Sequence, residues 1–194
     1  VFNTMISFMK DPVKILVTEH LTLEGISEYY VNVGEKIHKL PTLLDIFSKI
    51  AIQKAVIFAN SKQTVDFLKE QMESQNFVVS AIHVNMQQRE RDEIMQQFRL
   101  GASRVLIATD LIARGIDVQS VTLVFNFELP PKKETYLHRI GRSGRYGRKG
   151  VAINIIEKNE MKQMHYIEQF YKTRINELPA NIDEIVKQTN DQDI

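Results

Sequence analysis

The sequence contains no cysteine, which excludes disulfide bonds and zinc sites built on thiolates and is compatible with a reducing compartment. No apolar run approaches the roughly 18 residues that a membrane-spanning helix needs. The first residues, VFNTMISFMKDPVK, also lack the basic start and the cleavage site of a signal peptide. We therefore expect a protein that makes no contact with a membrane.

Several enzyme motifs are missing as well. The chain has no G-x-x-x-x-G-K-[ST] phosphate loop, no G-x-G-x-x-G after a strand, no G-x-S-x-G and no H-E-x-x-H. The five histidines are scattered and form no pair of metal ligands; they are His20, His38, His83, His138 and His165. We expect neither a phosphate cradle nor a metal site within this chain.

The overall composition is ordinary for a globular protein. The 194 residues are 43% hydrophobic and 25% charged, which suits one domain with a packed core. The net charge of +1 hides a segregation, because seven lysines and arginines outnumber one glutamate between positions 132 and 149. Between positions 177 and 194, five acidic residues outnumber one lysine. A basic patch on a near-neutral domain indicates a local anionic ligand.

Short apolar runs alternate with helical patterns along the chain. We expect strands at 28–33, 55–59, 77–82, 105–108, 121–127 and 151–156. Near-continuous apolarity, as at 105–108, is typical of strands buried on both faces of a parallel sheet. Apolar residues at helical spacing predict one helix with Pro41 in its first turn, one capped by Ser61 and one ended by Gly101. This alternation predicts an α/β fold with a mostly parallel open sheet and helices on both faces.

Polar side chains follow several predicted strands at the point where each strand ends. Asn60 follows the run at 55–59, His83 the run at 77–82, and Thr109 and Asp110 the run at 105–108. In open α/β sheets, ligands bind beyond the carboxyl ends of the strands. Any one of these residues would more often belong to a turn or a helix cap. Together they predict a site at this edge of the sheet.

The most basic segment reads KKETYLHRIGRSGRYGRK, and in it Arg142 and Arg145 are each preceded by a glycine. Glycine lets the backbone approach a ligand closely, and guanidinium groups fork onto phosphate oxygens. The segment therefore suits a polyphosphate better than a packed core, although a solvated basic loop or a nuclear-import signal would have a similar composition. Arginines without a phosphate loop indicate half of a site, with the other half on another domain.

Four segments resemble the motifs of one family. AVIFANSK (55–62), QRER (88–91), ATDLIARGID (108–117) and YLHRIGRSGRYGRKG (136–150) look like those of the second RecA-like domain of DEAD-box RNA helicases, in the family's order and at about its spacing. The similarity covers about residues 22–188 and is greatest with the initiation factor 4A branch. It implies a RecA-like three-layer fold and an RNA-stimulated ATPase that separates RNA strands.

The resemblance also divides the chain. It implies an interdomain linker and the end of a preceding domain at 1–21, a helicase C-terminal RecA-like domain at 22–188 and a flexible tail at 189–194. The family's first domain carries the phosphate loop and the D-E-A-D motif, and neither is present here. We therefore expect the C-terminal half of such a protein, inactive alone, with ATP and Mg²⁺ held mainly by the N-terminal RecA-like domain.

The resemblance implies roles for individual residues. Arg142 and Arg145 would be catalytic arginine fingers on the terminal phosphate of ATP. Asp117 would accept hydrogen bonds from the ribose hydroxyls, and Gly115 would let the backbone approach the nucleotide. His138 and Asp110 would act at the interface with the other domain. The residues expected to contact or position the RNA backbone are Asn60, Gln88, Arg91, Thr109, Arg114 and Arg139.

The chain departs from the family in one place. After His83 the family usually has Gly-Asp, whereas this sequence has Val84 and Asn85. Valine is bulkier and stiffer than glycine, so RNA affinity at this edge is the property that the departure affects. Contacts to the RNA backbone otherwise imply binding without sequence preference.

Two alternatives to a helicase half stay open. One is a non-catalytic RecA-like module that binds RNA or protein, and the other is a motor that acts on DNA. The Arg142 and Arg145 pair favours the helicase, because two arginines are costly to keep in a module without nucleotide. The expected location is cytoplasmic, with a nuclear location as the alternative. The expected partners are RNA, the N-terminal domain, and either a translation-initiation scaffold or exon-junction proteins.

Overall fold

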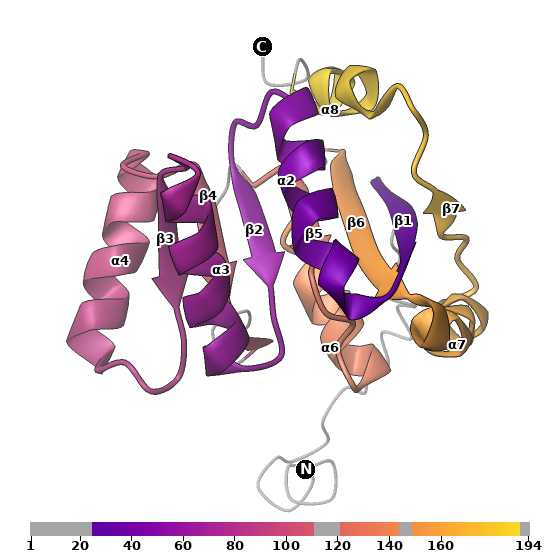
Figure 1. Ribbon diagram of the computed structural model, residues 1–194, viewed down its shortest axis with the longest axis horizontal. Helices are drawn as coiled ribbons and strands as arrows, with labels where there is room; N and C mark the ends of the chain where they lie inside the picture. Colours follow the sequence, from indigo (N-terminus) through magenta and orange to yellow (C-terminus); the bar gives the residue numbers. More distant parts are fainter. Residues whose placement is uncertain (1–24, 111–120, 144–148, 191–194) are drawn as a thin grey trace, which may run out of the picture.

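The computed structural model describes residues 25–110, 121–143 and 149–190. Within them, seven parallel strands form one open sheet in the order β3-β4-β2-β5-β6-β1-β7 (Figure 1). The strands are β1 (Ile26–Gly34), β2 (Ala55–Phe58), β3 (Val79–Ile82), β4 (Val105–Ala108), β5 (Leu123–Asn126), β6 (Gly150–Glu157) and β7 (Asn176–Glu177). The helices are α2 (Lys39–Lys49), α3 (Lys62–Ser74), α4 (Gln88–Leu100), α6 (Lys133–Ile140), α7 (Met161–Tyr171) and α8 (Ile182–Asn190).

Helices cover both faces of the sheet, because neighbouring residues in a strand point to opposite faces. Ile57 of β2 packs in the core under α2, α3 and α8, and Val56 packs on the other face under α4. Farther along that second face, Ala152 and Ile156 of β6 pack against α6 and α7. The predicted α/β class and the RecA-like three-layer arrangement are confirmed.

The observed strands differ from the predicted runs mainly at their ends. The run at 105–108 matches β4, whereas β1 starts at Ile26, two residues before the predicted start. The sequence does not predict β7, whose two residues are exposed and pair only with Tyr29 and Tyr30 of β1.

Two predicted helix ends are confirmed. The Ser61 side chain accepts a hydrogen bond from the Thr64 amide at 3.1 Å and caps α3. Gly101 ends α4 with a φ of 83°, in the left-handed region that favours glycine. At the chain end, α8 runs to Asn190, two residues into the segment predicted as a tail. The predicted linker at 1–21 and the rest of that tail lie outside the described residues.

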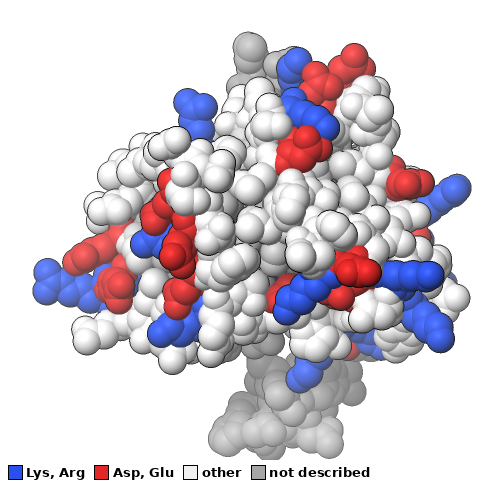
Figure 2. All heavy atoms as spheres, viewed as in Figure 1, with Lys and Arg blue, Asp and Glu red and all other residues white. Residues whose placement is uncertain are grey.

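No helix in the described part of the chain is long and apolar enough to cross a membrane. Over α2 and α3, basic and acidic side chains are interspersed (Figure 2). A surface of positive charge alone would attract a polyanion. With both signs mixed, this face offers no such attraction.

Candidate functional site

The carboxyl ends of the central strands meet at the lower edge of the sheet in Figure 1. Backbone hydrogen bonds continue past the strands, from the Ala59 amide to the Ala108 carbonyl at 3.1 Å and from the Phe127 amide to the Phe58 carbonyl at 3.0 Å. These bonds fix the segments that follow β2, β4 and β5 beside one another. The predicted convergence of polar residues at this edge therefore has a firm backbone frame.

Arg139 of α6 lies at the centre of these segments and is completely buried. Its Nη2 donates to Asn60 Oδ1 at 2.6 Å, and its Nη1 donates to the Glu128 carbonyl at 2.6 Å and to Asn126 Oδ1 at 3.2 Å. Its Nε donates to the Asp110 carboxylate, which is the ion pair that balances the buried charge. One guanidinium thus joins the ends of β2, β4 and β5.

The burial of Arg139 bears on two predictions, one about its contact with RNA and one about the basic segment. Arg139 was expected to contact or position RNA, and a side chain with 0% exposure has only the positioning role open to it in this structure. The basic segment was also expected to suit a phosphate better than a packed core, which is wrong for its first half. Tyr136, Arg139 and Ile140 lie on one side of α6, three and four residues apart, and are buried against the sheet.

Asn60 is held at three points yet stays exposed. Its backbone amide donates to Glu128 Oε2 at 2.7 Å, and its side-chain Nδ2 donates to the Leu129 carbonyl at 2.9 Å. A carboxamide offers two donors and two lone pairs. With one of each engaged by Leu129 and Arg139, the Asn60 side chain retains one donor and one acceptor for a ligand.

Three buried polar atoms lack a hydrogen-bond partner among the described residues: His83 Nδ1, Arg91 Nε and Thr109 Oγ1. Thr109 is 8% exposed and His83 is 5% exposed, and both follow strands that end at this edge. The other ring nitrogen of His83, Nε2, lies 3.4 Å from Asp66 Oδ1. Since native proteins rarely leave buried polar atoms unsatisfied, each of these atoms can bond water, a ligand or a part of the chain outside the described residues.

Some of the remaining predicted residues lie in the described part of the chain, and the others lie outside it. Gln88 is exposed at the start of α4 and donates to Asp92 Oδ1 at 2.8 Å. His138 is exposed in the last turn of α6, and its carbonyl accepts a hydrogen bond from Arg142 Nε at 3.0 Å. Arg142 is therefore folded back on α6 and only 9% exposed. The predicted residues that lie outside the described part are Arg114, Gly115, Asp117 and Arg145.

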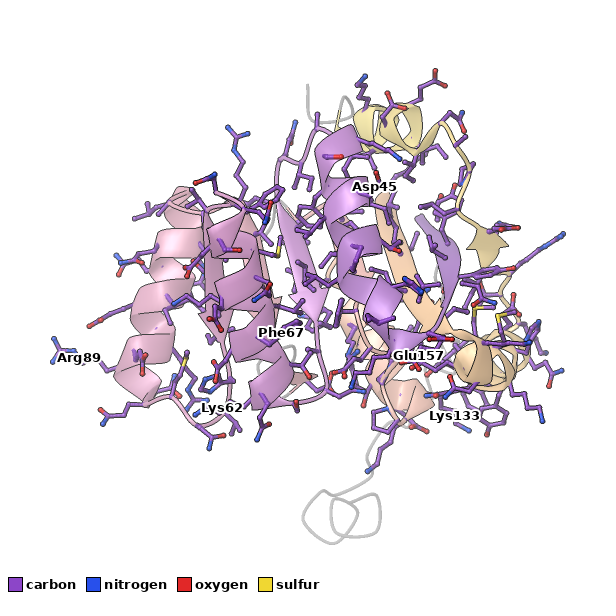
Figure 3. The ribbon with its side chains drawn as sticks, in the orientation of Figure 1. Asp45, Lys62, Phe67, Arg89, Lys133 and Glu157 are labelled. Carbon is purple, nitrogen blue, oxygen red and sulfur yellow. The ribbon has the colours of Figure 1, made fainter. Side chains whose placement is uncertain are left out.

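Sequence reasoning missed Asn126 and Glu128. Glu128 follows the predicted run at 121–127, as Asn60 follows the run at 55–59, whereas Asn126 is the last residue of β5 and lies inside that run. Both contact Arg139 at this edge, Asn126 through its side chain and Glu128 through its carbonyl. It gave no role to two exposed cations, Lys62 and Arg89, which lie at the starts of α3 and α4 (Figure 3). In the described ranges, no group of three or more His, Asp or Glu residues is placed to hold a metal ion.

Known helicases are similar to this chain in sequence. A profile of the family described as helicase conserved C-terminal domain matches residues 35–147. The ATP-dependent RNA helicase eIF4A of Kluyveromyces lactis is 54% identical over 179 residues, which make up 92% of this chain and 45% of that protein. Eukaryotic initiation factor 4A of Drosophila melanogaster is 56% identical over 180 residues, with the same shares of 92% and 45%. The chain thus spans less than half the length of these curated relatives.

Solved structures show the same fold. S. cerevisiae Dbp5 bound to RNA and ADP BeF3 superposes with a TM-score of 0.80 at 33% identity, over 88% of this chain and 46% of that one. The isolated C-terminal domain of the DEAD-box protein Dbp5 gives a TM-score of 0.77 at 33% identity, over 86% of this chain and 99% of that domain. The chain belongs to the helicase conserved C-terminal domain family, and it is similar to part of initiation factor 4A and to the C-terminal domain of the DEAD-box protein Dbp5.

Proposed function

We propose that this chain provides half of an RNA-binding surface and the arginine fingers of an RNA-stimulated ATPase, in a protein where a phosphate-loop domain completes the site. The observation that carries this proposal is the convergence of Asn60, Asp110 and Thr109 at the carboxyl edge of the sheet, where buried Arg139 bonds Asn60 and Asp110. Alone, the chain is expected to bind RNA weakly and to hydrolyse no ATP.

The groups at this edge suit an RNA backbone. Asn60 keeps a donor and an acceptor, Thr109 has a hydroxyl without a partner in the described part of the chain, and Gln88 is exposed. Hydroxyls, amides and guanidinium groups contact phosphates and sugars without reading bases. Affinity should therefore depend on salt, with log K falling by about 0.7 per phosphate contact per log unit of salt on single strands.

The nucleotide role rests on Arg142, Arg145, Asp117 and Gly115. A guanidinium stabilises charge on a transferring phosphoryl group. The bond to the His138 carbonyl uses Nε alone, so the Nη groups of Arg142 would be the donors to a phosphate on the facing domain. His138 is exposed in the last turn of α6 and would meet that domain. ATP and Mg²⁺ would supply the phosphoryl chemistry, bound mainly by the other domain.

The folded-back Arg142 also favours a second candidate, a RecA-like module that binds RNA or protein without turnover. The two candidates differ in what substitution of Arg142 does to ATP hydrolysis.

For the helicase, the names of the relatives from K. lactis and D. melanogaster support translation initiation in the cytoplasm. A scaffold of that process would be the protein partner, with nuclear mRNA processing and exon-junction proteins as the alternative.

Thr109→Val in the two-domain protein tests the RNA surface. Valine keeps the shape of threonine and removes the hydroxyl, which has no partner among the described residues, so the fold should lose little stability. A hydrogen bond to a charged group contributes about 1.5–3 kcal/mol, so the RNA concentration for half-maximal ATPase should rise about 10-fold. The control, Thr122→Val, removes a buried hydroxyl just before β5, at the opposite end of the sheet, and should leave this value unchanged. Equal RNA dependence in both variants would contradict the proposal.

A further inference from the structure

A continuous series of buried and partly buried hydrogen bonds crosses the sheet face under α6 and ends at Thr173, between α7 and β7. We call it the polar chain, and its members in order are Asn60, Arg139, Asn126, Asn154, Tyr136, Glu28 and Thr173. Beyond Arg139, Asn126 Nδ2 donates to Asn154 Oδ1 at 2.8 Å, and Asn154 Nδ2 donates to the Tyr136 hydroxyl at 3.2 Å. That hydroxyl donates to Glu28 Oε2 at 2.6 Å, and the Thr173 hydroxyl donates to Glu28 Oε1 at 2.5 Å.

The two asparagines at its centre occupy apolar surroundings. Asn126 of β5 and Asn154 of β6 are paired in register, and both are 0% exposed. The same face of these strands carries Val124, Ala152 and Ile156, which belong to the hydrophobic core. An apolar pair would suit these surroundings as well, since replacing both partners of a buried hydrogen bond by apolar groups can be nearly neutral for stability. Their presence calls for a role besides stability.

The chemistry of the groups gives the polar chain one direction. A guanidinium can only donate, so Asn126 must turn Oδ1 toward Arg139 and Nδ2 toward Asn154. Asn154 must then accept through Oδ1 and donate through Nδ2, both to Tyr136 and to the Tyr29 carbonyl at 2.9 Å. The proton of the Tyr136 hydroxyl is left for Glu28. Each side chain therefore has a single orientation that satisfies its neighbours, from the cation at one end to the carboxyl group at the other.

We infer that Tyr136, Asn126 and Asn154 are positioning residues for RNA binding. They hold the Arg139 guanidinium in the orientation that presents Asn60 and Asp110 at the carboxyl edge. A fully satisfied buried network specifies one arrangement of its members. Loss of a link relaxes the next side chain, and the effect reaches RNA through Arg139 and Asn60. This inference rests on the proposed RNA-binding function and extends it to residues that RNA cannot touch.

The first test is Tyr136→Phe in the two-domain protein, which removes the hydroxyl that links Asn154 to Glu28. Members of one network couple by about 0.5–3 kcal/mol, so the RNA concentration for half-maximal ATPase should rise at least about 2-fold, while turnover at saturating RNA stays near that of the unchanged protein. The control is Tyr171→Phe, which removes a hydroxyl bonded to the Lys133 carbonyl at 3.0 Å, outside the polar chain. It should leave RNA dependence unchanged.

The route is tested by repeating Tyr136→Phe in an Asn60→Ala background. If the polar chain acts through Asn60, the effect of Tyr136→Phe on RNA dependence should disappear there. An effect of the same size in both backgrounds would overturn the inference. If Tyr136→Phe binds RNA normally while Thr109→Val does not, the inference fails and the proposed function stands. If both bind RNA normally, the proposed function fails as well.

Thr173, at the partly buried far end, supplies a variant pair that should not endanger folding. Thr173→Val keeps the methyl group and loses the hydroxyl that bonds Glu28, whereas Thr173→Ser keeps the hydroxyl and loses the methyl group. We expect the RNA concentration for half-maximal ATPase to rise about 2-fold in the valine variant and to stay unchanged in the serine variant. The reverse order would show that packing of the methyl group, and not the polar chain, matters at this position.

Discussion

Arg139 shows how much one buried side chain can organise. Its guanidinium serves the side chains of Asn60, Asn126 and Asp110 and the carbonyl of Glu128 from a position with no exposed surface. A lysine ammonium is a single point with three donors on a flexible stem and cannot reach all four acceptors. Acceptors left unpaired in a buried site cost more than the net value of their bonds.

Arg139→Lys should therefore lower the free energy of unfolding of this chain by about 3 kcal/mol, because it keeps the charge but leaves more than one buried acceptor unpaired, at about 1–3 kcal/mol each. Arg89→Lys is the matched control, because the Arg89 side chain is 90% exposed and surface changes usually stay within about 0.5 kcal/mol. Urea unfolding of the three proteins measures both values. A loss for Arg139→Lys as small as that for Arg89→Lys would contradict the organising role.

Glu28 makes stability depend on pH. Burial raises the pKa of its carboxyl group above the ordinary value of 4.5, and the hydrogen bonds from Thr173 and Tyr136 only partly offset this, while Glu168 adds to the rise. The folded state thus holds the proton more tightly than the unfolded state. Its stabilising contribution is complete below pH 4.5 and is lost as the pH rises through the raised pKa.

Glu28→Gln removes this titration. Between pH 4.5 and pH 7, the unfolding free energy of the unchanged protein should fall relative to that of the variant, by about 1.4 kcal/mol for each unit of pKa elevation. Glu70→Gln, at an exposed position of α3, measures the effect of the substitution itself. Parallel stability curves for the unchanged protein and Glu28→Gln across this range would refute the assignment.

At the scale of elements, α3 has a sequence-encoded start that can be measured. The Ser61 side chain satisfies the Thr64 amide, one of the donors that a helix start leaves without an intrahelical partner. Ser61→Ala should cost about 1 kcal/mol of unfolding free energy. Ser74→Ala, at the other end of the same helix, removes a hydroxyl bonded to the Gln71 carbonyl and caps no amide. Thermal unfolding should give a lower midpoint for Ser61→Ala than for Ser74→Ala. Equal midpoints would show that the Ser61 cap does not stabilise α3.

The elements that the sequence predicts well depend on neighbours in sequence. The run at 105–108 identifies β4 because four consecutive apolar residues suit a strand buried on both faces. Ser61 and Gly101 mark helix ends through local bonds and local backbone conformation. By contrast, β7 has two exposed residues and exists only through its pairing with β1, so no side-chain pattern announces it.

The sequence does not predict α6, because one of its sheet-facing residues is Arg139. A cation interrupts the apolar spacing of Tyr136 and Ile140, and its burial depends on acceptors brought from three other segments. The same reason limits prediction of the site. Asn60 and Asp110 each follow a predicted strand, so the sequence places them at the same edge of the sheet. The guanidinium that bonds both is visible only in the folded chain.

At the scale of the whole molecule, strand order explains where the site lies. β2 stands between β4 and β5, so the segments after these three strands are neighbours although they are far apart in sequence. α6 then crosses this edge and carries Arg139, His138 and the approach to Arg142. Under the proposed function, one frame would present a group that faces RNA and a group that faces the nucleotide, and a second domain facing this edge would complete both sites.

The central claim is that Arg142 and Arg145 act on the transferring phosphoryl group. Changing either residue to lysine in the two-domain protein keeps the charge and loses the planar fork. Arginine fingers contribute about 10³–10⁵ in rate, so turnover should fall at least about 100-fold while nucleotide binding changes little. Arg148→Lys, just outside the pair, is the control and should be nearly normal. Steady-state ATPase at saturating RNA is the decisive measurement: a large loss at Arg142 and Arg145 alone is the predicted result, and near-normal turnover of both variants would contradict the account.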